Sequence, residues 1–137
     1  MEENIVKGLG APLGQLSPLV LAYMGDVLYE MKIREHVVRK NPLLKISDIH
    51  KAVTGFARAE AQAKAVLSLQ EELTEEEWDI VKRGRNQKPT GIPKKASVSE
   101  YRYATGFEAL LGALYHEGKL ERAEEIIAKA IKIIEEN

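Results

Sequence analysis

Two stretches of the sequence are apolar around the whole circumference of a helix, yet each contains one carboxylate. Asp26 is the only charged residue in the stretch 18–29, and Glu108 is the only one in the stretch 103–115. A helix that is apolar on every face is normally buried. A buried ionised carboxylate costs several kcal/mol unless it is paired or binds a metal. The pattern therefore predicts two buried helices and a partner for each acid.

Small residues predict that these two helices cross closely. Ala22 and Gly25 are three apart, and Ala109, Gly112 and Ala113 follow at spacings of three and four, so each set lies on one face of its helix. A glycine inside a helix lowers helix stability by about 1 kcal/mol relative to alanine. A close approach of the two backbones would explain why glycine occurs at Gly25 and Gly112. If the two faces meet, both carboxylates lie beside the crossing and can share one cation. Mg²⁺ fits this role because it binds oxygen ligands. The alternative is structural, with each acid capping a helix or paired with a basic side chain.

The rest of the pattern predicts an all-α fold of six or seven helices. No alternating strand pattern occurs, and most of the chain is rich in Ala, Leu, Glu and Lys. Capping residues predict helix starts at Ser17-Pro18, at Thr74 and at Ser97 or Ser99. Asn41-Pro42 and Gly118 predict helix ends. A helical stretch from Ser47 to Leu69 is expected to break near Thr54-Gly55, and the last helix covers Leu120 to about Glu135.

We expect one domain over residues 1–137, with an irregular arm at 1–16 and a basic loop at 85–97. No apolar run approaches the ~18 residues of a membrane helix. The chain has no cysteine and begins with acidic residues, unlike a signal peptide. These features predict a cytoplasmic protein with no membrane partner.

A net charge of −1 hides one strongly basic segment. Residues 82–103 contain seven Lys and Arg side chains against one Glu, whereas the other 115 residues carry 13 basic and 20 acidic groups. Such a cluster favours contact with nucleic-acid phosphates, and a solvated charged loop is the alternative. The candidate RNA-binding residues are Arg83, Arg85, Asn86, Lys88, Lys94, Lys95 and Arg102.

Two motifs resemble the ribonuclease III family. The segment 21–28, Leu-Ala-Tyr-Met-Gly-Asp-Val-Leu, is similar to the signature helix of ribonuclease III domains, and Phe107-Glu108-Ala109-Leu110-Leu111-Gly112 is similar to their second acidic motif. Residues 82–86 and 101–105 resemble, more narrowly, Mini-ribonuclease III, the short bacterial form without a double-stranded-RNA-binding domain. The resemblance covers nearly the whole chain.

The resemblance implies an all-α homodimer that cleaves double-stranded RNA with Mg²⁺ and leaves 5′-phosphate and 3′-hydroxyl ends. It assigns Asp26 and Glu108 as the metal-binding catalytic acids. It also implies rRNA binding and rRNA processing in ribosome biogenesis, through maturation of the large-subunit (23S) ribosomal RNA precursor. Leu19, Ala22 and Thr105 replace further acids of the longer family members, so the outer carboxylate set is incomplete.

Two other classes of function stay open from the residues alone. A degenerate nuclease fold would bind structured ribosomal RNA without cutting it, which the missing outer acids favour. A helical protein-interaction module would need no nucleic acid, and the clustered basic charge argues against it. The main prediction is a Mg²⁺-dependent endoribonuclease.

Overall fold

The computed structural model describes residues 8–89 and 97–136, and within them it contains six α-helices and no strand. This confirms the predicted all-α class. In chain order the elements are η2 (Leu13–Gln15), α1 (Pro18–Lys40), α2 (Ile46–Ala57), α3 (Ala59–Ser68), η3 (Gln70–Glu72), α4 (Glu75–Arg85), α5 (Val98–His116) and α6 (Leu120–Glu135), where η marks a short 3₁₀ turn.

Local capping explains most of the helix boundaries. The Ser17 hydroxyl accepts a hydrogen bond from the backbone of α1, with proline in the first turn. Thr74 and Ser97 each begin a helix with a complete capping box. Gly118 follows α5 with a φ of +74°, a left-handed conformation that suits glycine. The predicted starts of α1, α4 and α5 and the predicted end of α5 are thereby confirmed.

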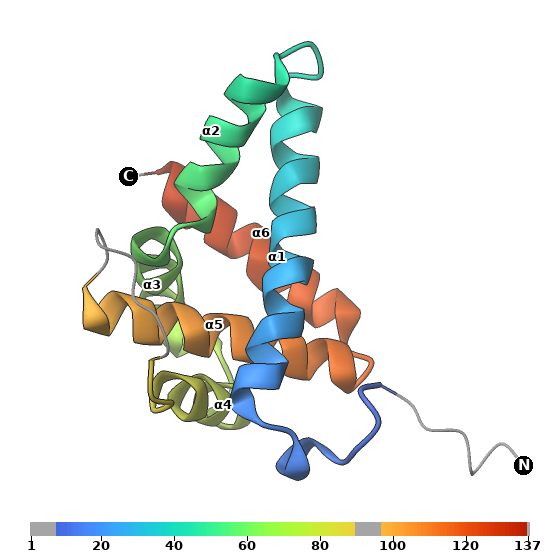
Figure 1. The fold of residues 1–137 in the computed structure, drawn as a ribbon, viewed down its shortest axis with the longest axis vertical. Helices are drawn as coiled ribbons and strands as arrows, with labels where there is room; N and C mark the ends of the chain where they lie inside the picture. The colour runs from blue at the N-terminus through green and yellow to red at the C-terminus, as the bar shows by residue number, and fades with distance from the viewer. Residues whose placement is uncertain (1–7, 90–96, 137) are drawn as a thin grey trace, which may run out of the picture.

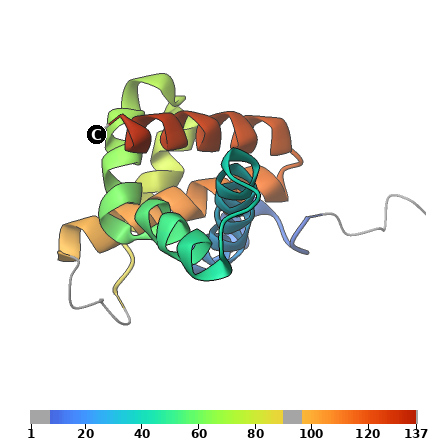
Figure 2. The same cartoon turned by 90° about the horizontal axis from the view of Figure 1, so that it is seen from above.

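Helix α5 lies at the centre of the molecule. It crosses α1, and it packs against α3, α4 and α6 (Figures 1 and 2). Its residues Ala109–Leu114 are all buried, and Phe107 is fully buried in the main hydrophobic core. Most of the second apolar stretch therefore forms the buried helix that the sequence predicted, although Tyr115 is exposed, and the helix positions Glu108 in a partly buried place.

Helix α1 does not fit the same prediction. Leu21, Gly25 and Tyr29 face the core, but Tyr23 and Val27 on another face are 76% and 61% exposed. The expectation of a helix buried on every side was wrong for this stretch, because the described residues cover only one of its faces. An apolar face that includes Tyr23 and Val27 therefore remains exposed on α1.

The helical stretch 47–69 breaks at Arg58 and not near Thr54-Gly55. Gly55 lies inside α2, while Arg58 is extended, with a ψ of 155°, and separates α2 from α3. The side-chain amide of Gln62 donates a hydrogen bond of 2.7 Å to the carbonyl of Ala57, the last residue of α2. The glycine therefore does not mark the break, and α3, which follows the break, packs against α5.

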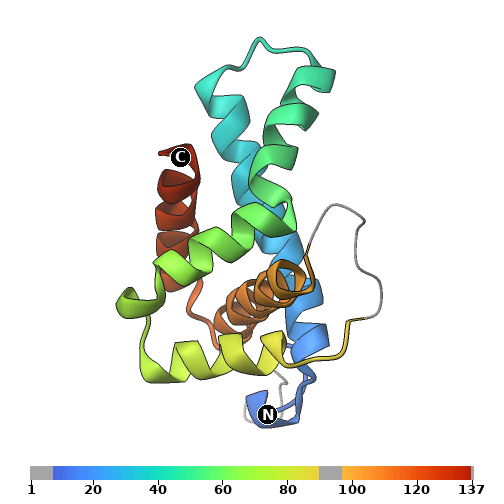
Figure 3. The ribbon, with the colours of Figure 1, turned by 90° about the vertical axis from the view of Figure 1, so that its left-hand side faces the viewer.

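Helices α1 and α2 form a hairpin whose connecting end extends away from the other helices, while the first half of α1 packs against α5 (Figure 3). None of the helices in the described ranges combines the length and apolar character needed to cross a lipid bilayer.

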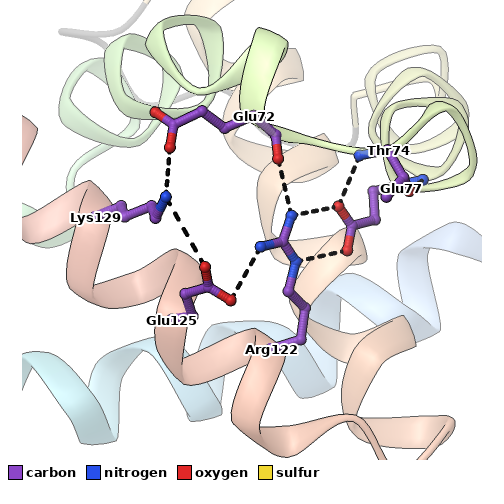
Figure 4. Close-up of polar contacts among 6 residues, drawn as sticks. All are labelled: Glu72, Thr74, Glu77, Arg122, Glu125 and Lys129. Carbon is purple, nitrogen blue, oxygen red and sulfur yellow. Dashed lines mark hydrogen bonds and ion pairs between the residues drawn. The ribbon is translucent and has the colours of Figure 1, made fainter.

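An ion-pair network joins the start of α4 to α6. Arg122 donates to both carboxylate oxygens of Glu77, at 2.8 and 2.9 Å, and to the Glu72 carbonyl at 2.9 Å (Figure 4). Lys129 contacts the carboxylates of Glu72 and Glu125. The hydrogen bond from Arg122 is the main reason that the pKa of Glu77 lies below its ordinary value. The network holds α4, which carries part of the basic segment, in a defined place.

Candidate active site

The predicted close crossing of α1 and α5 is present. A Cβ atom added to Gly25 would lie 1.8 Å from the carbonyl oxygen of Glu108, and one added to Gly112 would lie 1.8 Å from that of Leu21. No side chain fits at either position, so the two backbones are in direct contact. This contact places Asp26, next to Gly25, beside Glu108.

Asp26 and Glu108 interact directly at this crossing. Asp26 is exposed, whereas Glu108 is only partly accessible. Burial, then the negative charge of Asp26 and a hydrogen bond with it, raise the pKa of Glu108 to about 8. Two carboxylates this close repel each other unless a proton or a cation lies between them, so the pair provides a place for one positive charge.

Aromatic packing next to the crossing of α1 and α5 stabilises it. The buried Tyr29 ring meets the Phe107 ring edge to face, with 5.4 Å between centroids, and the Tyr29 hydroxyl donates a hydrogen bond of 2.8 Å to the carbonyl of Phe56. Burial and the nearby Glu108 raise the pKa of Tyr29 above its ordinary value. Tyr29 therefore serves as a neutral anchor that joins α1, α2 and α5 at the acidic pair.

An open cavity of about 530 Å³ adjoins Glu108. Polar side chains from three elements line it, among them Arg58, Gln62 and Thr105. Gln62 is 3% exposed, and its amide nitrogen lies 3.3 Å from Glu108 Oε2. The sequence prediction missed Gln62. The available signal was its place one turn before Val66, where a lone polar residue interrupts the buried face of α3.

Two acids and the side-chain oxygen of Gln62 are the candidate metal ligands at this site. No group of three or more His, Cys, Asp or Glu side chains suited to a metal occurs in the described ranges. Mg²⁺ is commonly held by one or two carboxylates together with waters and substrate phosphates. Asp26 and Glu108 fit that pattern. The buried Gln62 Oε1 accepts no hydrogen bond from the described residues, which adds an unused oxygen beside the pair.

The basic segment begins on a helix and not in a loop. Lys82, Arg83 and Arg85 belong to the last turn of α4, and Asn86 caps it. Arg83 and Asn86 are exposed. Arg85 is partly engaged, because it bonds to Asn86 Oδ1 at 3.0 Å and lies over the Tyr103 ring at 5.6 Å from the centroid. Basic charge in this turn also suits the negative end of the helix dipole.

Lys88 and Arg102 come together at a small pocket beside Thr105. The Arg102 Nε atom is buried and has no hydrogen-bond partner among the described residues. Thr105 also lines the cavity of Glu108, so this basic pair lies next to the acidic site. Lys94 and Lys95 fall outside the described residues.

Comparisons with known proteins agree with this geometry. The family model for the ribonuclease III domain matches residues 19–119, which include both acids. The chain is 48% identical to a Mini-ribonuclease 3 of Thermoanaerobacter sp. (strain X514), over 88% of this chain and 84% of that protein. It is 46% identical to a Mini-ribonuclease 3 of Brevibacillus brevis, over 87% and 88% of the two chains. A crystal structure of a Fusobacterium nucleatum protein, 33% identical, superposes with a TM-score of 0.77 over 86% of this chain and 93% of that one.

Proposed function

Since this chain belongs to the ribonuclease III family, in its Mini-ribonuclease 3 group, and is an endoribonuclease, we propose that it cleaves double-stranded RNA with Mg²⁺ held by Asp26 and Glu108. The observation that carries the proposal is the backbone contact at Gly25, which brings the two acids together. The substrate we propose is the large-subunit ribosomal RNA precursor in the cytoplasm, as the family resemblance implies.

The two carboxylates have different surroundings and so different tasks. Asp26 is exposed, while Glu108 lies deeper, against Gln62. Asp26 and Glu108 would hold Mg²⁺, and the bound ion would supply the positive charge that activates water and stabilises the attacked phosphodiester. Glu108 would hold it as the ionised carboxylate. The products are a 5′-phosphate and a 3′-hydroxyl.

The basic side chains grip the RNA backbone. Arg83, Asn86 and Lys88 are exposed near the end of α4, and Arg102 lines the small pocket beside Thr105 together with Lys88. We propose that Arg85, Lys94 and Lys95 also bind phosphates of the RNA backbone. Each phosphate contact releases counterions, so affinity for duplex RNA falls as salt rises.

A second copy of the chain covers the open face of α1. Tyr23, Val27 and Met31 follow one another at intervals of four and are 59% or more exposed. Such an apolar stripe on a helix favours burial against an identical stripe in a twofold dimer. Two sites in one dimer then match the two strands of a duplex. Replacing Val27 with Glu should convert the dimer to a monomer in light scattering. A wild-type chain that is monomeric at micromolar concentration contradicts this part of the proposal.

The central experiment compares the wild-type chain with Asp26→Asn and Glu108→Gln on a labelled RNA duplex. We expect Mg²⁺-dependent cleavage by the wild type, none in EDTA, and a loss of at least about 100-fold in either variant. Asp26→Asn should keep the fold or stabilise it, because it removes the repulsion with Glu108. Full Mg²⁺-dependent cleavage by Asp26→Asn would refute the assignment.

A further inference from the structure

The side chain of Gln62 is a buried amide whose orientation its neighbours determine. The carbonyl of Ala57 can only accept a hydrogen bond, so the atom 2.7 Å from it is the amide nitrogen. The same nitrogen lies 3.3 Å from Glu108 Oε2. Both hydrogens of the amide group therefore have acceptors, one on the backbone and one on the catalytic carboxylate.

The carbonyl oxygen of the same amide is left without a partner. Gln62 Oε1 is buried and receives no hydrogen bond from the residues that the structure describes. An unsatisfied buried polar atom costs about 1–3 kcal/mol, whereas an apolar side chain of the same shape would avoid that cost. Packing alone therefore does not account for a glutamine here, and the unused oxygen lies beside Glu108 at the cavity that both residues line.

We propose that Gln62 is a positioning residue for the Mg²⁺ site, an inference that rests on the proposed function. Its amide nitrogen orients the Glu108 carboxylate toward Asp26, and its carbonyl oxygen accepts a hydrogen bond from the hydration shell of the shared cation. A neutral amide suits this place because a third carboxylate would add repulsion to Glu108. Gln62 thus completes a site to which the described residues contribute only two acids.

The test measures Mn²⁺ binding to the full chain without RNA by electron paramagnetic resonance, well below the unfolding temperature of each variant. Gln62→Met keeps the length of the side chain and removes both polar contacts. Gln62→Asn keeps the amide but is too short to span Ala57 and Glu108. Loss of such a supporting contact typically weakens metal binding by about 10- to 100-fold, which we expect for both variants. Gln70→Met, at an exposed position on η3, is the matched control.

Thermal unfolding in EDTA separates positioning from a structural role. Gln62→Met should unfold near the wild-type temperature, since it removes the unpaired oxygen but also the hydrogen bond to the Ala57 carbonyl. Unchanged Mn²⁺ affinity in either folded variant would overturn the proposal, and so would an equal loss in the Gln70→Met control. If the wild type itself binds no Mn²⁺ and cuts no duplex, the proposed function fails. If the wild type does both and Gln62→Met binds Mn²⁺ equally well, only the role of Gln62 fails.

Discussion

Replacing Gly25 with alanine tests whether the contact between α1 and α5 builds the active site. The new Cβ would lie 1.8 Å from the Glu108 carbonyl oxygen, 2.7 Å from its carbonyl carbon and 2.9 Å from the Gly112 nitrogen. Carbon and oxygen atoms that touch without bonding lie about 3.3 Å apart. The helices must therefore separate by roughly 1.5 Å at this point, the difference between about 3.3 Å and 1.8 Å.

The cost of this separation is large because backbone atoms cannot rotate away. Overpacking usually costs about 1–3 kcal/mol, so we expect about 3 kcal/mol or more at Gly25. For a chain of this length the unfolding temperature falls by about 4 °C per kcal/mol, or about 12 °C here. A displacement of this size also separates Asp26 from Glu108, and a misplacement of about 1 Å can reduce a reaction rate about 100-fold.

Gly55→Ala is the matched control, because this glycine also lies inside a helix but has no atom within 4 Å of the added Cβ. Helix propensity alone should stabilise it by up to about 1 kcal/mol. The assays are thermal unfolding by circular dichroism and cleavage of a labelled RNA duplex in Mg²⁺. If Gly25→Ala unfolds and cleaves like the wild type, the close crossing does not build the site.

Three further predictions concern charge and hydrogen bonding. Because the folded pKa of Glu108 is raised to about 8, the folded state binds more protons than the unfolded one. Without divalent cations, the free energy of unfolding should therefore fall by up to about 1.4 kcal/mol per pH unit as pH rises from the ordinary carboxyl pKa toward 8. Urea unfolding measures this slope, and Glu108→Gln should remove it. Arg122→Met leaves Glu77 unpaired and should lower the free energy of unfolding by about 2–3 kcal/mol near neutral pH. Since the pKa of Glu77 is lowered in the folded state, this loss should shrink as pH falls through that folded pKa, and urea unfolding checks it. Tyr29→Phe strands a carbonyl at the end of α2 and should cost about 1–2 kcal/mol, and a smaller effect in chemical unfolding would mean that water replaces the hydroxyl.

Helix boundaries were predictable where local hydrogen bonds decide them. Ser17, Thr74 and Ser97 cap backbone groups within three residues of themselves, and Gly118 supplies a left-handed turn. Such interactions need no distant partner, so the sequence alone reveals them. The break at Arg58 was not predictable in this way, because the Arg58 side chain makes no capping hydrogen bond at the start of α3.

The sequence by itself indicated Glu108 and the glycines of the crossing, since a charge in a buried apolar helix and a glycine inside a helix both conflict with local preference and so indicate a tertiary cause. For Asp26 the argument from burial was wrong, because its position is exposed, and its place next to Gly25 is what brings it to Glu108. Only the tertiary structure decided which face of α1 is covered, and that Gln62 from α3 lies against Glu108. A face of a helix is buried or open according to what packs on it. Residues 46 positions apart meet only when α3 and α5 have packed together.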